Sequence, residues 1–225
     1  MDGLTISSQG TILLEPNLNW QIIGTPDLNG DGKSDLLWYK STTGHVVGKL
    51  MDGLTISSQG MILIEPNLNW KIIGQPDLNG DGKADLLWYN SITGHLVGKL
   101  MDGLTISSQG TILIEPNLNW QIIGTPDLNG DGKSDLLWYN PTTGHVVGKR
   151  MDGLTVSSQG TILIEPNLNW KIIGQPDLNG DGKADLLWYN SITGHLVGKL
   201  MDGLTISSQG TILIEPNLNW QIINK

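Results

Sequence analysis

The sequence predicts an all-β protein, a β-propeller built from four-stranded blades. Three observations predict it: a period of 50 residues, four short apolar runs within each period, and Gly, Pro or Asn between the runs. Repeats of this length are typical of propellers and solenoids, and four strands per repeat is the pattern of a propeller blade. No segment sustains the spacing of an amphipathic helix, so we expect no helices.

The period divides the chain into four full repeats and one half repeat, which we expect to form a single repeat domain over residues 1–225. The full repeats span 1–50, 51–100, 101–150 and 151–200, and the half repeat spans 201–225. Repeats one and three share one set of substitutions, and repeats two and four share another. This alternation indicates that a 100-residue unit was copied once, by duplication or by design.

Four strands are expected in the first repeat, each bounded by turn-forming residues. The first spans residues 20–24 and leads into an acidic loop, and the second spans residues 35–39. The third spans residues 45–51, and the fourth runs over residues 54–65 with a break near 59–60. Val, Ile, Leu, Trp and Tyr fill these runs, and this composition between Gly, Pro and Asn favours strands.

The two ends of the chain do not complete a blade. Residues 1–19 look like the outer strand of a blade and residues 220–223 like the inner strand, while the two middle strands are missing. Either four blades close and the ends are spare, or a fifth blade is incomplete, or the ends pair with another chain. Unpaired strand edges favour self-association through these ends.

The acidic loop after the first strand reads Asp-Leu-Asn-Gly-Asp-Gly-Lys-Ser-Asp in the first repeat and recurs in every full repeat. Oxygen-bearing side chains stand at loop positions 1, 3, 5 and 9, and the main-chain carbonyl of position 7 adds a further ligand. Such oxygen-rich loops suit Ca²⁺, and the two glycines allow the tight curl. We expect about one Ca²⁺ per full repeat. The candidate ligands are Asp27, Asn29, Asp31, Lys33, Asp35, Asp77, Asn79, Asp81, Lys83, Asp85, Asp127, Asn129, Asp131, Lys133, Asp135, Asp177, Asn179, Asp181, Lys183 and Asp185.

The alternative for this loop is turn chemistry alone, since Asn-Gly and Asp-Gly are strong hairpin turns. A short turn does not need a third carboxylate at Asp35, and this favours metal binding. The loop is not an EF-hand, because Trp38 stands where the EF-hand has its last Glu and both flanks are expected to be strands. We therefore expect a calcium loop set in a β-hairpin.

The run Asp-Leu-Asn-Gly-Asp-Gly-Lys-Ala-Asp-Leu-Leu-Trp, with Thr-Gly after it and Met-Asp-Gly further on, resembles the FG-GAP/VCBS repeat. That repeat forms blades of integrin-type β-propellers and of many secreted or surface bacterial proteins. The resemblance covers all four full repeats and implies calcium binding by Asp27, Asn29, Asp31, Asp35 and their copies. The chain departs from the family in having no Phe, so that Leu28 stands where Phe is frequent, and in the near-identity of its blades.

Charge and composition narrow the possible partners. Twelve of the 22 carboxylates lie in the four loops together with four Lys, and the 10 carboxylates outside the loops are nearly balanced by nine Lys and Arg. Four divalent ions would raise the net charge from −9 to about −1, so we attribute the acidity to ion sites and expect no nucleic-acid surface. The sequence has no apolar run of membrane-spanning length, no signal-peptide pattern and no Cys. Because such loops usually work at extracellular calcium levels, we expect an extracellular or cell-surface setting.

The aromatic residues are a skewed set of nine Trp, four Tyr and no Phe. They either pack between blades or form sugar-stacking surfaces in clefts between blades, as in propeller lectins related to the FG-GAP family. Asn17, Asn19, Tyr39 and His45 are then candidates for polar partners. The candidate ligand-binding residues are Trp20, Trp38, Tyr39, His45, Trp70, Trp88, Trp120, Trp138, Trp170 and Trp188.

No catalytic set is evident in the sequence. Each of the four histidines is isolated from other His and from carboxylates at catalytic spacing, and no Gly-x-Ser-x-Gly elbow occurs. We therefore expect a protein that is not an enzyme. Two functions remain: a multivalent binding or adhesion module for carbohydrate, or a structural scaffold, natural or designed, in which calcium only stabilises the blades.

Overall fold

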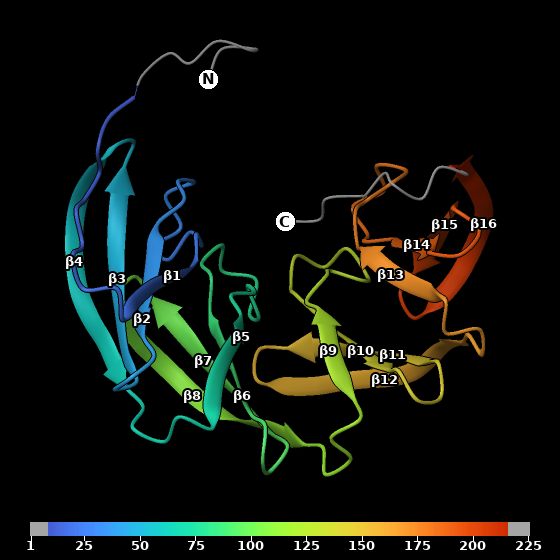
Figure 1. Ribbon diagram of the computed structural model, residues 1–225, viewed down its shortest axis with the longest axis horizontal. Coiled ribbons are helices and arrows are strands. Elements are labelled where there is room, and N and C mark those ends of the chain that lie inside the picture. Colours follow the sequence, from blue (N-terminus) through green and yellow to red (C-terminus); the bar gives the residue numbers. More distant parts are fainter. Residues whose placement is uncertain (1–8, 216–225) are drawn as a thin grey trace. The chain divides into compact units, whose positions relative to one another are not determined.

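The computed structural model describes residues 9–215, and these residues contain sixteen β-strands and no helix (Figure 1). They form four antiparallel sheets of four strands, and within each sheet the strands lie side by side in the order of the chain. The first sheet consists of β1 (Trp20–Gly24), β2 (Leu36–Lys40), β3 (His45–Asp52) and β4 (Thr55–Ile64). The predicted all-β class and the predicted four-stranded blade per repeat are therefore confirmed.

The other three sheets repeat this design with nearly the same bounds. The second consists of β5 (Trp70–Gly74), β6 (Leu86–Asn90), β7 (His95–Asp102) and β8 (Thr105–Ile114). The third consists of β9 (Gln121–Gly124), β10 (Leu136–Asn140), β11 (His145–Asp152) and β12 (Thr155–Ile164). The fourth consists of β13 (Trp170–Gly174), β14 (Leu186–Asn190), β15 (His195–Asp202) and β16 (Thr205–Ile214).

The outer hairpin of the first sheet, formed by β3 and β4, contains two β-bulges. Ser57 and Ile62 are skipped in the register between the two strands. Between them, Gln59 and Gly60 pair regularly with β3, so the predicted break near residues 59–60 is wrong. A bulge lets the strand bend and twist while the pairing on both sides continues.

The predicted outer strand at residues 1–19 is wrong for the part that the structure describes. Residues 9–19 form no strand before β1 begins at Trp20. In the later repeats the equivalent residues pair with a strand of the β3 type, as β4 pairs with β3. The predicted inner strand at residues 220–223 lies outside the described residues.

The described residues divide into two compact units, each holding two sheets. One unit covers residues 9–77 and 81–113 and holds the sheets β1–β4 and β5–β8. The other covers residues 78–80 and 114–215 and holds the sheets β9–β12 and β13–β16.

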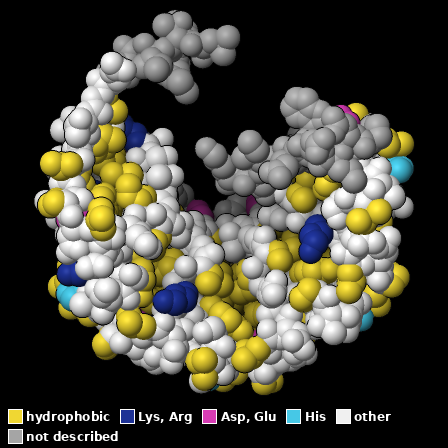
Figure 2. Space-filling view, in the orientation of Figure 1, with side chains coloured by type: hydrophobic (Ala, Val, Ile, Leu, Met, Phe, Trp, Pro, Cys, Tyr) yellow, Lys and Arg dark blue, Asp and Glu magenta, His cyan; other side chains and the backbone are white. Residues whose placement is uncertain are grey.

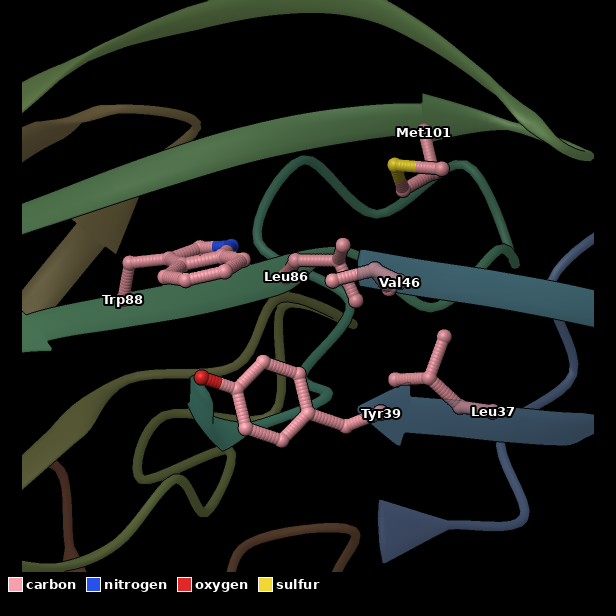
Figure 3. Close-up of a cluster of buried hydrophobic side chains, with 6 residues drawn as sticks. All are labelled: Leu37, Tyr39, Val46, Leu86, Trp88 and Met101. Carbon is pink, nitrogen blue, oxygen red and sulfur yellow. The ribbon is translucent and has the colours of Figure 1, made fainter. Parts of the chain in front are cut away.

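The core of each unit lies between its two sheets. In the first unit, apolar side chains of neighbouring sheets point toward one another (Figure 3): Leu37, Tyr39, Val46, Leu86, Trp88 and Met101. In the second unit the equivalent cluster consists of Leu137, Val146, Leu186, Trp188 and Met201. Neighbouring sheets thus meet through opposite sets of alternating residues: Leu37 and Tyr39 of β2 face Leu86 and Trp88 of β6.

Candidate functional site

Each acidic loop curls around its first carboxylate. In the first loop, Asp27 Oδ1 accepts a hydrogen bond from Gly30 N and Asp27 Oδ2 accepts one from Gly32 N, both at 2.8 Å. Gly30 and Gly32 have φ angles of 76° and 80°, which side chains with a Cβ rarely adopt. The third and fourth loops form the same bonds. The positions of the Asp and the two glycines thus shape the loop through local hydrogen bonds.

The last carboxylate of the loop is buried and holds the loop to the outer hairpin. Asp35 is 0% exposed, and its Oδ2 accepts from Leu28 N at 2.9 Å while its Oδ1 accepts from Met51 N at 2.8 Å. Asp135 makes the equivalent pair of bonds in the third sheet. Because a carboxylate oxygen has two lone pairs, each oxygen retains one that can face an ion.

The lysine of each loop pairs with an Asp at the end of the third strand of its sheet, and in the first loop Lys33 Nζ also lies 3.4 Å from Asp31 Oδ2. Lys83 Nζ lies 2.7 Å from Oδ1 of Asp102, the last residue of β7. The third and fourth sheets form the same ion pair at 2.5 and 2.6 Å. This hydrogen bond is the main reason why the pKa of Lys83 is raised. In the second, third and fourth loops the ammonium therefore neutralises a carboxylate at the end of a strand, outside the loop.

In the third loop, the crowded oxygens perturb the ionisation of a buried carboxylate. Burial raises the pKa of Asp135 to about 6, and the charges of Asp131 and Asp127 add to the rise. Asn129 Oδ1 is buried without a hydrogen-bond partner, while Asn129 Nδ2 donates to Asp131 Oδ2 at 2.8 Å. An orphaned oxygen beside carboxylates that repel one another is a donor set that fits a hard cation.

The predicted calcium ligands share one loop in each repeat, but their carboxylates do not converge. Within residues 9–215, no three Asp, Glu or His side chains lie close enough together to hold a metal ion. Their oxygens instead accept hydrogen bonds from amides of the loop, as Asp31 does from Lys33 N at 2.9 Å. Calcium binding by these residues stays a prediction, and it requires the carboxylates to turn toward a shared centre.

A second candidate site is a pocket on one face of each sheet, called here the indole pocket. In the second sheet it has a volume of about 360 Å³, and its main lining residues are Glu65, Trp70, Trp88, Val97, Lys99 and Gln109. The equivalent pockets of the first, third and fourth sheets measure about 410, 300 and 320 Å³. Every described sheet therefore presents two indoles, an ammonium, an amide and a carboxylate in one concave place.

Strand register brings these side chains to one face. Trp88 of β6 pairs with Val97 of β7, and Lys99 lies two residues further along the same face. Lys99 Nζ is 6.0 Å from the centroid of the Trp88 ring, within cation–π range. On the face of the molecule shown in Figure 2, Lys and Arg side chains likewise stand among hydrophobic ones.

The predicted ligand-binding residues fall into different settings. All eight predicted Trp line an indole pocket. Tyr39 lies on the opposite face of its sheet, in the core. His45 does not line the pocket, but its ring packs edge-on against Trp20 with centroids 6.4 Å apart. Asn17 Oδ1 accepts from Asn19 N at 3.1 Å, so these two residues shape the turn before β1.

The Lys, Gln and Glu of the pocket were missed in the sequence. Alternation along β3 places Val47 and Lys49 on the face of Trp38, so the period-2 pattern could have identified Lys49. Gln59 depends on the register of the bulged hairpin, and Glu15 on the path of the chain before β1. These two residues carry no signal that sequence spacing alone would reveal.

Part of the chain matches a known family of repeats. Residues 127–188, from the third acidic loop to Trp188 of β14, match the family described as FG-GAP-like repeat. This match confirms the resemblance to the FG-GAP repeat that the sequence motif indicates. No curated protein sequence matches the chain.

Solved structures offer only distant similarities. The nidogen/laminin complex matches with a TM-score of 0.45 and 16% identity, over 80% of this chain and 62% of that one. The Photorhabdus luminescens Tc holotoxin pore matches with a TM-score of 0.41 and 16% identity, over 88% of this chain and 12% of that one. The V. cholerae biofilm matrix protein Bap1 matches with a TM-score of 0.37 and 17% identity, over 88% and 40%. This chain thus spans less than two thirds of each of these chains, and similarity at this level carries no argument about function.

Proposed function

We propose that this chain is a calcium-stabilised binding module whose indole pockets bind carbohydrate. The observation that carries the proposal is the recurrence of one pocket, with equivalent residues, in all four described sheets. In the second sheet, the partly exposed Trp70 offers a flat apolar surface to a sugar ring. Lys99, Gln109 and Glu65 offer hydrogen bonds to its hydroxyl groups, as ligand pockets with a few placed polar groups do.

Repetition is the reason to expect adhesion rather than capture of a free sugar. Four pockets on one chain can engage several residues of a polysaccharide or several glycans on a surface. The second contact then forms at a high effective concentration, so avidity exceeds the affinity of a single pocket.

A glycan screen followed by titration tests the carbohydrate proposal. We expect binding to at least one glycan of a broad panel in millimolar calcium, with a saturable change in tryptophan fluorescence. The double variant Trp70→Ala/Trp170→Ala should reduce the initial slope of the binding isotherm to about half, because two of the four equivalent pockets lose their stacking surface.

The matched control is Ile92→Ala/Ile192→Ala, which removes apolar side chains that are 65% and 64% exposed in the same two repeats. This control should leave glycan binding unchanged. A broad panel that shows no binding in millimolar calcium would contradict the carbohydrate proposal.

Calcium is assigned a stabilising role in this proposal. A bound divalent ion supplies the positive charge that offsets repulsion among the carboxylates of one loop. Because the ion binds only the folded loop, its binding free energy adds to the stability of the fold. In the third loop, Asp127, Asn129, Asp131 and Asp135 would hold it, together with the carbonyl of Lys133.

Native mass spectrometry and thermal melting test the calcium sites. We expect four bound ions per chain, and a melting temperature that falls by about 5–10 °C in excess EDTA. Asp131→Ala should lower the stoichiometry to three, whereas the control Asp152→Asn, outside the loop, should keep four. The absence of bound ions together with an unchanged melt in EDTA would reduce the loops to hairpin turns.

A purely structural scaffold is the second candidate, and burial of the indoles favours it. Trp88, Trp138 and Trp188 are each 1% exposed, as expected for packing residues. Their Nε1 atoms, however, are buried without hydrogen-bond partners, a cost that an apolar side chain would avoid. The scaffold predicts the same calcium stoichiometry without glycan binding, so the two experiments together separate the two functions.

We also propose an extracellular or cell-surface setting, on the basis of the expected calcium levels. Within residues 9–215, the structure contains no helix that is both long and apolar enough to cross a membrane. The absence of enzymatic activity and self-association through the chain ends stay predictions.

A further inference from the structure

Each indole pocket holds an ammonium and a carboxylate that do not pair with each other. In the second sheet these groups are Lys99 on β7 and Glu65 after β4. The ion pairs seen among residues 9–215 are formed by the loop lysines and not by the pocket lysines. The pocket therefore presents two separate charges to a ligand.

The ammonium is held in place by neutral groups. Lys99 Nζ donates to Gln109 Oε1, and the equivalent bond recurs in all four pockets at 2.5–2.6 Å. The ring of Trp88 lies beside the same ammonium. Burial lowers the pKa of Lys99, and the charge of Glu65 opposes this only in part. A partly buried cation that is positioned by neutral partners is well prepared to receive an anion.

The carboxylate is fixed from the opposite side by the turn that follows it. Glu65 Oε1 accepts a hydrogen bond from Asn67 N at 3.0 Å, and the Glu of each other pocket accepts the equivalent bond at 2.9–3.0 Å. A carboxylate only accepts hydrogen bonds, so its second oxygen suits a hydroxyl donor. The two charged groups thus suit different parts of one ligand: Lys99 suits an anionic group, and Glu65 suits hydroxyl groups.

We propose that each indole pocket binds an anionic saccharide, with its carboxylate or sulfate at the lysine ammonium and its hydroxyl groups at the glutamate. The sugar ring stacks on the more exposed of the two indoles, which is Trp70 in the second sheet. Pocket volumes of about 300–410 Å³ lie at the small end for ligand sites and suit one or two sugar rings. This inference rests on the proposed carbohydrate function and narrows its ligand class.

Calorimetric titration of the calcium-loaded full chain with matched sugars tests the ligand class. The probes are methyl glycosides of glucuronic, galacturonic and mannuronic acid and a sulfated glucoside, each beside its neutral counterpart. We expect at least one anionic sugar to bind about ten-fold more tightly than its neutral counterpart, as one charge-assisted hydrogen bond would give. The difference should shrink at high salt. The uronate and sulfate titrations show which anion the pocket takes.

A pair of variants places the effect at the pocket. Lys99→Met/Lys199→Met removes the ammonium from two of the four pockets and keeps an apolar side chain of similar length. The initial slope of the isotherm for the anionic sugar should fall to about half, because that slope counts sites divided by Kd. The slope for the neutral sugar should fall by a smaller fraction, because the ammonium gives that sugar a hydrogen bond to a neutral hydroxyl rather than to an anion.

The control Lys71→Met/Lys171→Met removes the same charge from two exposed lysines of the same repeats. It should leave both slopes unchanged, and an equal loss in this control would overturn the proposal in favour of general electrostatic attraction. Equal affinity for anionic and neutral sugars would overturn the ligand class while the carbohydrate function stands. If no sugar of either kind binds, both the inference and the proposed function fail.

Discussion

Replacing Asp135 with Ala is expected to lower the free energy of unfolding by about 2–5 kcal/mol, with or without calcium. The buried carboxylate accepts hydrogen bonds from Leu128 N at 3.0 Å and Met151 N at 2.8 Å. Ala leaves both donors buried without a partner, and each such donor costs about 1–3 kcal/mol. Urea unfolding of the variant and the parent chain in EDTA measures the loss.

Asp135→Asn is the matched control, since its amide keeps one acceptor oxygen of the same shape. It should retain about half of the stability that Asp135→Ala loses. A loss that appears only in calcium would show that Asp135 acts through the ion alone. It would then contradict the role of this carboxylate in holding the loop to the outer hairpin.

Replacing Gly144 with Ala is expected to lower the free energy of unfolding by about 3–5 kcal/mol. Gly144 has a φ of 73°, and a Cβ at this position would overlap the carbonyl oxygen of Glu165. The two residues are also joined by a hydrogen bond from Glu165 N to Gly144 O at 2.9 Å. Main-chain atoms stand on both sides of the overlap, so no side chain can move to relieve it.

The control variant Gly153→Ala separates the cost of steric overlap from the cost of a positive φ angle. Gly153 has a φ of 61°, but no atom lies within 4 Å of the position that a Cβ would take there, so its substitution should cost only about 1–2 kcal/mol. Denaturant midpoints of the two variants give the comparison. Equal losses would mean that the contact between the turn at Gly144 and Glu165 yields easily, and that the turn does not fix this glutamate.

The strands and the core could be predicted because their signals are local. Residues 36–40 and 45–52 alternate between the two faces of their sheet, and turn-forming residues bound each run. The acidic loop was recognisable for the same reason, since all its oxygens come from nine consecutive residues. Its burial was not: Asp35 contacts Met51, sixteen residues away, through a bond that spacing does not indicate.

Only some residues of the pocket could be predicted from the sequence, because the pocket depends on the pairing between strands. Trp20 and Trp38 are candidates from the sequence because they are large aromatic residues. Lys49 and Gln59 are residue types common on any surface, so the sequence alone does not single them out. Two bulges determine which residue of β4 lies opposite Lys49. The residue types at Ser57 and Ile62 do not predict that the bulges occur there. Tyr39 was predicted to bind the ligand together with Trp38. Because the two residues are adjacent in one strand, their side chains lie on opposite faces of the sheet, and Tyr39 lies in the core.

The packing between sheets is the same in both units, and this sameness bears on how such a chain can change. Leu37 and Val46 meet Leu86 and Trp88 in one unit, and the equivalent residues meet in the other. Few side chains distinguish one sheet from the next, among them Met61 in the first pocket and Arg150 of β11. Because each core cluster lies within its own unit, gain or loss of a 100-residue pair would leave the core cluster and the pockets of the remaining pair intact. Copy number can then set how many ligands one chain engages, while the chemistry of each pocket stays constant.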